Sequence, residues 1–229
     1  PVSRTPEDGR FATRMKAIEA AVTSSPKAII VNSPNNPSGV VYPPEFIEEL
    51  VKFCEKKGIY YISDDIYHKL VFKKRKWSAA YKFTDQDVES SKIIVVNGIA
   101  KAYGMTGFRI GWCIANRKIV EVMTNIQGQI TSCTALVSQA AAEGALNGLQ
   151  SVVESLRLTI ENDCEVMLTE LGAFSGIRCT PPDGTFYCLP DFRAYTANSV
   201  ELANFLLKKA RVVTVPGKDF GMEGYLRLS

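Results

Sequence analysis

The chain has 229 residues, of which 46% are hydrophobic and 22% are charged, and its formal net charge is +3. These values are typical of a globular protein with one large domain or two smaller ones. No apolar run approaches the roughly 20 residues of a membrane-spanning helix, and no signal peptide is visible, so we expect no membrane partner. Positive residues are scattered except in 73–76, which we interpret as a solvated loop rather than a nucleic-acid site.

The cysteines show no Cys-x-x-Cys spacing, and the only histidine is His68. A zinc site is therefore not expected, and we predict no bound metal. Scattered thiols in apolar contexts indicate reduced core cysteines and a cytoplasmic protein. The six positions are Cys54, Cys113, Cys133, Cys164, Cys179 and Cys188.

The first hundred residues alternate between strand and helix patterns. Apolar, β-branched runs predict strands at 28–32, 59–63 and 93–97, while spacing of three to four residues predicts helices over 12–24 and 44–57. This alternation indicates a parallel sheet with right-handed crossovers. We expect its strands to be buried on both faces.

Each predicted strand is followed by polar side chains. Asn36, Asp64 and Lys101 should converge in one crevice, because parallel strands end at the same edge of the sheet. Taken alone, the segment around Asn36 is also an ordinary turn, and Asp64 with Asp65 also fits a helix N-cap. If Tyr67 faces the crevice, His68 faces away and is structural or exposed.

Lys101 and Arg109 follow the third strand in a region rich in small residues. A partly desolvated cleft favours the uncharged, nucleophilic form of an amine. Arginine keeps its charge and offers a planar fork of donors to a phosphate or carboxylate. The pair suggests an enzyme that forms a Schiff base with a phosphate-bearing cofactor.

The second half begins with a predicted strand over 109–115 and a helix over 118–128. A helix over 134–147, capped by residues 131–134, precedes a long amphipathic helix over about 150–172. After Gly172 the sequence pattern changes to short predicted strands and one helix, which indicates a small α+β domain. We therefore divide the chain into 1–148, part of a large domain, and 149–229, a connecting helix with the small domain.

Six segments together resemble the class I and II aminotransferases, fold-type I enzymes that use pyridoxal 5′-phosphate (PLP). They are SPNNPSG at 33–39, DDIY at 64–67, AKAYGMTGFRIG at 100–111, DGTFY at 183–187, PGKDFG at 216–221 and RLS at 227–229. The aspartate/prephenate-like branch looks most similar. The resemblance implies a three-layer α/β/α large domain with a mostly parallel sheet and a small α+β C-terminal domain.

The resemblance also implies roles for the residues of the crevice. Lys101 would form a Schiff base with PLP and later move a proton between substrate and cofactor. Asp64 would pair with the pyridine nitrogen, while Tyr67 and Asn36 would hydrogen-bond the phenolic oxygen. Asn36 would also border the substrate.

Three further residues complete the implied site. Arg109 would hold the cofactor phosphate, and Arg227 would bind the substrate α-carboxylate. Ser132 would reach the cofactor of a neighbouring subunit, which implies a homodimer. The implied reaction moves an amino group between an L-amino acid and a 2-oxo acid.

This chain departs from the family pattern just before Lys101. Where many relatives have Ser-x-x-Lys or Ser-x-Ser-Lys, it has Gly98-Ile-Ala-Lys101, so one phosphate-binding hydroxyl is missing. Asp65, usually glutamate in the family, is interpreted as structural. Two alternatives stay open: another fold-type I PLP enzyme such as a C–S lyase or a synthase, or a non-catalytic truncated paralogue or regulator sensor domain.

The family's N-terminal half, with a phosphate loop and an aromatic that stacks on the cofactor ring, has no counterpart in this sequence. We therefore expect the chain to be part of a longer protein, and residues 1–229 alone to be inactive.

Overall fold

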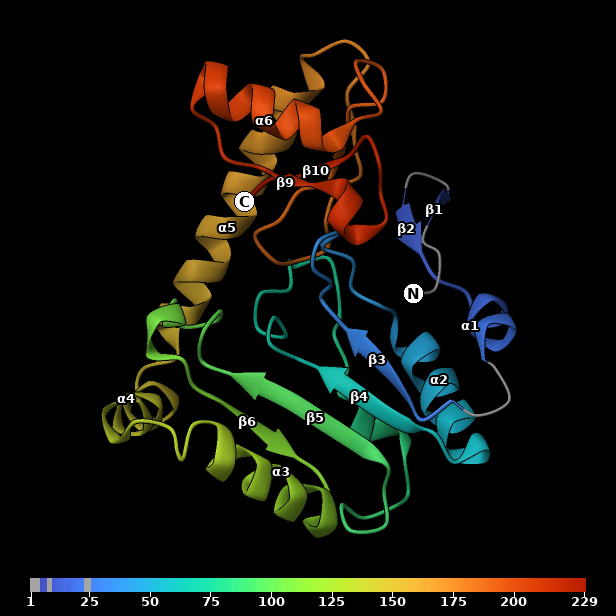
Figure 1. The fold of residues 1–229 in the computed structure, drawn as a ribbon, viewed down its shortest axis with the longest axis vertical. Coiled ribbons are helices and arrows are strands. Elements are labelled where there is room, and N and C mark those ends of the chain that lie inside the picture. The colour runs from blue at the N-terminus through green and yellow to red at the C-terminus, as the bar shows by residue number, and fades with distance from the viewer. Residues whose placement is uncertain (1–4, 8–9, 23–25) are drawn as a thin grey trace.

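The computed structural model describes residues 5–7, 10–22 and 26–229. At its centre lies a four-stranded sheet in the order β3-β4-β5-β6 (Figure 1). Strands β3 (Ala28–Asn32), β4 (Tyr60–Asp64) and β5 (Ile93–Gly98) are parallel, and β6 (Gly111–Ile114) runs antiparallel to β5. The three predicted parallel strands are therefore confirmed to within a residue at each end.

The register of the sheet sets the position of the crevice. Asn32 pairs with Asp64, and Asp64 pairs with Val96, so the three parallel strands end side by side. The polar segments that follow them emerge at this common edge, as expected for parallel strands.

One face of the sheet packs on α2 (Pro44–Lys57), which begins with a proline at its first turn and ends at Gly58 in the left-handed conformation, with φ 66°. The short 3₁₀ helix η1 (Ala80–Phe83) adds to this side. Together they enclose the main hydrophobic core, whose fully buried members include Leu50, Val51 and Ile59.

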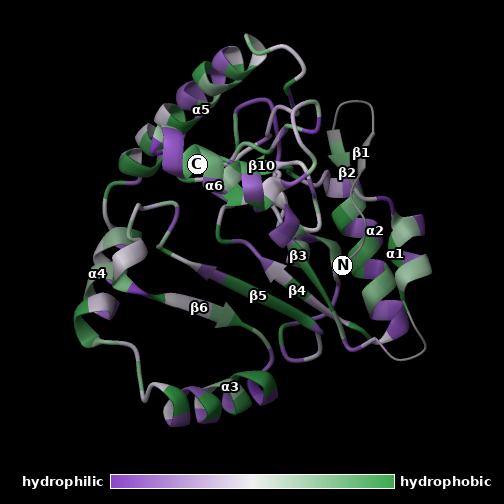
Figure 2. Cartoon of the chain, turned by 45° about the horizontal axis from the view of Figure 1, so that its top comes forward, coloured by the Kyte–Doolittle hydropathy of each residue, from purple (hydrophilic) through white to green (hydrophobic). Residues whose placement is uncertain are grey.

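The other face of the sheet is more open in the part of the chain that the structure describes. Ile30 is 70% exposed and Val96 is 40% exposed, whereas their neighbours Val31 and Val95 are buried. Figure 2 shows hydrophobic colour along these strands. The prediction that the strands are buried on both faces is therefore wrong for the described residues.

Helices α3 (Arg117–Ile130) and α4 (Leu136–Asn147) follow β6 and lie beside the sheet (Figure 1). The side chain of Asn116 caps α3 by accepting from the Ile119 backbone N–H at 3.0 Å. The predicted cap of α4 by residues 131–134 is wrong: its N-cap is Ala135, which has no side chain able to accept a hydrogen bond.

Helix α5 (Ser151–Gly172) leads from this region to the last part of the chain, at the top of Figure 1. There α6 (Ser199–Ala210) accompanies four two-residue strands, in the antiparallel pairs β7–β8 and β9–β10. Their bounds are β7 Arg178–Cys179, β8 Pro190–Asp191, β9 Val215–Pro216 and β10 Leu226–Arg227. The 3₁₀ helix η3 (Gly217–Phe220) follows β9.

The start of the chain differs from the sequence prediction. Helix α1 covers only Met15–Ala21, because the preceding residues form the antiparallel strands β1 (Thr5–Glu7) and β2 (Arg10–Ala12). The end of the predicted helix, at 23–24, lies outside the described residues. Within the described ranges, no helix is both long and apolar enough to cross a membrane.

Candidate active site

The loop after β3 is held by asparagine side chains. Oδ1 of Asn32 accepts a hydrogen bond from the Asn36 backbone N–H at 2.7 Å, and Nδ2 of Asn32 donates to the Asp64 carbonyl at 3.2 Å. Oδ1 of Asn35 accepts from the Ser38 hydroxyl at 2.8 Å. Asn32 thus ties the loop of Asn36 to the end of β4, which fixes Asn36 at the carboxyl edge of the sheet.

Asp64 and Asp65 follow each other at the end of β4 but differ in environment. Asp64 is half-buried and accepts one long hydrogen bond, from the Ile66 backbone N–H at 3.4 Å. Burial raises the pKa of Asp64 above its ordinary value, and the hydrogen bond from the Ile66 backbone N–H opposes this shift. A cationic group placed next to Asp64 would reverse this shift.

Asp65 is 4% exposed, and its Oδ1 accepts from the Ser63 hydroxyl at 2.6 Å. Burial raises the pKa of Asp65 from 3.8 to about 6, although the Ser63 hydrogen bond opposes the shift. Its backbone carbonyl lies 2.8 Å from Nδ1 of His68, whose other neighbours are Asn97 and the Trp77 ring. This side of the chain is structural, as predicted for His68.

We expect Asp65→Asn to raise the free energy of unfolding of the full-length protein at about pH 8, by at most about 3 kcal/mol. A buried acid with a raised pKa binds its proton more tightly in the folded protein than in the unfolded chain. The protonated carboxyl therefore contributes most to the free energy of unfolding below the unfolded-state pKa, and this contribution is lost as the pH rises through about 6. Asparagine does not ionise, so the variant keeps its free energy of unfolding as the pH rises. Denaturant unfolding at several pH values measures it.

The gain from Asp65→Asn should shrink between about pH 6 and pH 4 and vanish below. The exposed Asp85→Asn serves as the matched control and should change little at any pH. A gain independent of pH would show that the carboxylate of Asp65 is not the source.

Aromatic side chains connect Lys101 to the end of the chain. Nζ of Lys101 lies 5.7 Å from the centroid of the Phe186 ring, which packs 5.9 Å from the ring of Tyr67 and 4.5 Å from the ring of Tyr187. The hydroxyls of Tyr67 and Tyr187 are 3.2 Å apart. Burial, and then the Tyr187 hydroxyl, raise the pKa of Tyr67 well above its ordinary value, so this phenol stays a hydrogen-bond donor.

Arg227, in β10, reaches the same cluster. Its Nη1 donates to Oδ1 of Asn36 at 3.0 Å, and its guanidinium lies 4.6 Å from the Tyr187 ring centroid and 5.4 Å from that of Phe220. Its Nε is buried and has no hydrogen-bond partner among the residues that the structure describes. Leaving such a donor unpaired is costly, so this nitrogen is suited to an incoming anionic oxygen.

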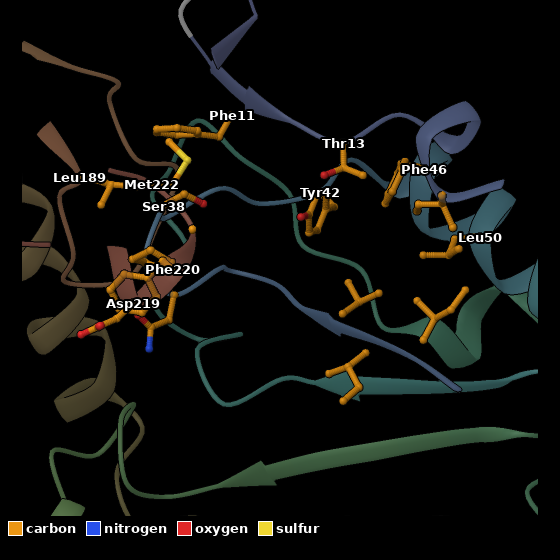
Figure 3. Close-up of a pocket in the computed structure, with 17 residues that line it drawn as sticks. Phe11, Thr13, Ser38, Tyr42, Phe46, Leu50, Leu189, Asp219, Phe220 and Met222 are labelled. Carbon is orange, nitrogen blue, oxygen red and sulfur yellow. The ribbon is translucent and has the colours of Figure 1, made fainter. Parts of the chain in front are cut away.

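A hollow of about 660 Å³ lies along β3 and reaches Asn36. Figure 3 shows Phe11, Met222, Phe220 and Asp219 at one end of it, and Tyr42, Phe46 and Leu50 at the other. The end of the hollow that contains Asn36 and Asp219 is therefore formed with the last part of the chain, and its Phe220 ring lies against Arg227.

Arg109 and Ser132 line a second hollow, of about 640 Å³. Arg109 is exposed, has a left-handed backbone with φ 53°, and donates from Nη1 to the Thr106 carbonyl at 3.0 Å. Ser132 is also left-handed, with φ 62°, and exposed. The predicted site residues thus fall into two groups. Arg109 and Ser132 line the same hollow, while the contacts described above connect Asn36, Tyr67, Lys101 and Arg227.

The segment before Lys101 is tightly packed. Gly98 pairs with Gly111 across β5 and β6, and a Cβ added at Gly98 would lie 2.8 Å from the Ile110 carbonyl oxygen. A Cβ at Gly111 would lie 2.8 Å from the Asn97 carbonyl oxygen. A serine at position 98 would therefore force the backbone of this pair to move.

The loop after Lys101 is tied to the start of α5. Nζ of Lys69 donates to the Tyr103 hydroxyl at 3.0 Å and to Oε1 of Gln150 at 2.9 Å, and the Tyr103 hydroxyl donates to the same oxygen at 2.8 Å. The Gln150 side chain also donates to carbonyls at the end of α4. These bonds hold the Lys101 loop between the sheet and the helices.

Sequence reasoning gave no role to Asn32, Phe186, Tyr187 or Phe220. The segment DGTFY at 183–187 was noted as a motif, and its two consecutive aromatics were the available signal. Within the described residues, no group of three or more His, Cys, Asp or Glu side chains is arranged to hold a metal ion.

A model of the family described as aminotransferase class I and II matches residues 1–229. The chain belongs to this family. The resemblance inferred from the motifs is therefore confirmed, and with it the fold class, since solved aminotransferases superpose on this structure. The aminotransferase from Pyrococcus horikoshii OT3 described as aromatic aligns with a TM-score of 0.91 at 31% identity, covering 100% of this chain and 61% of that one.

Other aminotransferases are similar to this one in sequence. A probable aspartate/prephenate aminotransferase of Aquifex aeolicus is 35% identical over 224 residues, covering 96% of this chain and 56% of the relative. The aspartate aminotransferase of Bacillus subtilis is 32% identical over 228 residues, covering 97% of this chain and 58% of the relative. The chain thus spans a little over half the length of the curated relatives it matches.

Proposed function

We propose that the protein carrying this chain is a PLP-dependent aminotransferase that moves an amino group between an L-amino acid and a 2-oxo acid. The observation that carries this proposal is the hydrogen bond from Arg227 to Asn36. It brings a guanidinium with an unpaired Nε to the sheet edge where Asp64 and the Lys101 loop also end.

The residues present fit the cofactor by the chemistry of their donors. Asp64 is a half-buried carboxylate whose pKa is raised by burial, and a protonated ring nitrogen beside it would favour its charged form. Tyr67 is held as a hydroxyl donor and suits a phenolate oxygen. The exposed guanidinium of Arg109 suits a phosphate.

When bound, PLP supplies an electron sink that stabilises negative charge on the substrate α-carbon. In this proposal Lys101 would hold the cofactor covalently through Nζ, and the same amine would carry the proton to and from the substrate α-carbon. Phe186 lies against this amine and keeps water from one side of it. The chemistry needs both an uncharged and a protonated amine, which a lysine provides.

Arg227 orients the substrate. Asn36 accepts from its Nη1 and the Tyr187 ring supports its face, which leaves Nε available to an oxygen of the α-carboxylate. Similar proteins are named as aspartate/prephenate and aromatic aminotransferases. Because every α-amino acid carries an α-carboxylate, this role of Arg227 is compatible with donors that differ in their side chains. The side-chain preference is left to the experiment.

We further propose that the protein is a cytoplasmic homodimer. All six cysteines are free thiols, which is typical of a reducing compartment. Close to Ser132, Leu136 and Val137 are 79% and 76% exposed, an apolar surface that suits a second subunit. We place the boundary between the large domain and the connecting helix with the small domain at 148/149.

The test uses the full-length protein loaded with PLP and mixed with single L-amino acids. With an L-amino acid that donates its amino group, we expect the absorbance of the cofactor to change and the corresponding 2-oxo acid to form. Adding a 2-oxo acid acceptor should restore the original spectrum. Release of sulfide or ammonia in place of a recoverable amino group would contradict transamination and favour a lyase. Failure to take up PLP would contradict a PLP enzyme of any kind.

A further inference from the structure

Three of the thiols that the sequence placed in separate positions meet in the last part of the chain. Cys164 lies in α5, Cys179 in β7, and Cys188 in the segment before β8. The Cys188 thiol interacts with both the Cys164 thiol and the Cys179 thiol, and the Cys179 thiol also donates to the Thr180 carbonyl at 3.8 Å. The scattered positions of these cysteines in the sequence gave no sign that the three come together.

The backbone explains why Cys179 and Cys188 face each other. Cys179 pairs with Pro190 in the antiparallel β7–β8 ladder, and Cys188 is two residues earlier on the same strand line. Residues two apart point to the same face, so the two cysteines are diagonal neighbours. The Cα atoms of such neighbours are roughly 7–8 Å apart, more than the roughly 4.4–6.8 Å that is usual across a disulfide.

A bond between them therefore requires the two segments to approach each other. A disulfide formed in this way is strained, and strained disulfides are easily reduced again. This geometry is typical of a reversible bond rather than a permanent structural one.

The hydrogen bonds differentiate the three thiols. The bond from the Cys188 thiol, assisted by the Leu189 backbone N–H, lowers the pKa of Cys179 below its ordinary value. The hydrogen bond from Cys164 lowers the pKa of Cys188, but the contact with Cys179 and burial outweigh it and raise that pKa to about 12. Cys179, which is half-buried rather than buried, is thus the thiol that ionises first.

We propose that Cys179 and Cys188 are a redox-active dithiol that a low-molecular-weight disulfide, such as oxidised glutathione, converts to an intramolecular disulfide. The Cys179 thiolate attacks one sulfur of the small disulfide, which forms a mixed disulfide and releases one small thiolate. Cys188 then loses its proton and attacks the Cys179 sulfur, which releases the second small thiol. Two protein thiols are oxidised and one small disulfide is reduced to two thiols.

Oxidation at this place acts on the candidate site through the backbone. Cys188 exchanges two hydrogen bonds with Leu228, its N–H donating at 3.1 Å and its carbonyl accepting at 2.9 Å. Leu228 follows Arg227, and Cys188 follows Tyr187, whose ring supports the Arg227 guanidinium. Drawing Cys188 toward Cys179 displaces the residues on both sides of that contact.

The consequence for catalysis rests on the proposed function. Because Arg227 is assigned to the substrate carboxylate, oxidation should raise KM for the amino-acid donor roughly tenfold, the equivalent of weakening one charge-assisted hydrogen bond. It should change kcat less, since Lys101 and Asp64 are not linked to Cys188 by a backbone pair. A reductant should restore the original KM.

The test treats the reduced full-length protein with oxidised glutathione, blocks the remaining thiols by alkylation, and maps tryptic peptides. Cleavage after Arg178 and Arg193 gives one peptide, 179–193, that holds both cysteines. We expect this peptide to resist alkylation and to be lighter by two hydrogen atoms than its reduced form. This readout does not depend on enzymatic activity, so it stands even if the proposed reaction is wrong.

Variants identify the pair. Cys179→Ser and Cys188→Ser should each abolish the bridged peptide, while Cys133→Ser, an exposed cysteine outside the trio, should leave it. The proposal is overturned if both cysteines of 179–193 are alkylated, if glutathione stays on Cys179 without closure, or if 179–193 is linked to the 158–178 peptide of Cys164. The bridged peptide with an unchanged KM would overturn the coupling to Arg227.

Discussion

Replacing Lys101 with alanine should lower the rate of the amino-acid half-reaction of the full-length protein by at least about 10²–10⁴-fold, the contribution of a positioned acid/base group alone. The loss of covalent attachment adds to it. In the native protein, borohydride reduction and peptide mapping should find the pyridoxyl group on Lys101, and in the variant no lysine should carry it. Both measurements follow from an amine that lies against Phe186 at the end of β5.

Lys69→Ala is the matched control for Lys101→Ala. Lys69 contacts Tyr103 in the same loop but donates to Tyr103 and Gln150 rather than facing Phe186. Its removal should reduce activity modestly and leave the covalent adduct in place. A pyridoxyl group on a lysine other than Lys101 in the native protein would refute the assignment.

The second large effect is expected at Asp64. Asp64→Asn should lower the half-reaction rate by about 10²–10³-fold, because a carboxylate about 4 Å from a protonated ring nitrogen attracts it by roughly 4 kcal/mol at an effective dielectric near 20. Asparagine has nearly the same shape, so the change isolates the charge. Stopped-flow absorbance of the half-reaction measures it.

Asp65→Asn is the control for Asp64→Asn, because Asp65 is turned into the core and bonded to Ser63. It should change the half-reaction rate far less than Asp64→Asn, while it changes stability as described above. Equal losses in the two variants would mean that the roles of the two carboxylates are misassigned.

The strands that lead to Asn36, Asp64 and Lys101 were predictable from sequence. Their β-branched runs are separated by segments whose residues mark the start and the end of a helix. Pro44 at the start of α2 and Gly58 at its end are examples. The start of the chain was less predictable: the spacing of Met15 and Ile18 is helical, yet antiparallel pairing with the preceding strand β1 places Ala12 in β2. The spacing of apolar residues along a helix does not reveal that part of the segment pairs as a strand instead.

Contacts between distant segments were not predictable from local patterns. Arg227 and Asn36 are 191 residues apart, and the Tyr67–Tyr187 pair is 120 residues apart. Motif order suggested that these residues share a site, but not which of them touch. The meeting of Cys164, Cys179 and Cys188 likewise depends on the packing of α5 against β7, which no spacing in the sequence encodes.

The close pairing of Gly98 with Gly111 constrains how this sequence can evolve. In this conformation a serine at position 98 meets the Ile110 carbonyl, so regaining the hydroxyl that many relatives carry is not a single-step change. The backbone at positions 110 and 111 would have to shift to make room for the added side chain. The two glycines are thus coupled: while they face each other, a side chain at either position meets a backbone carbonyl, so the effect of a change at one depends on the backbone at the other.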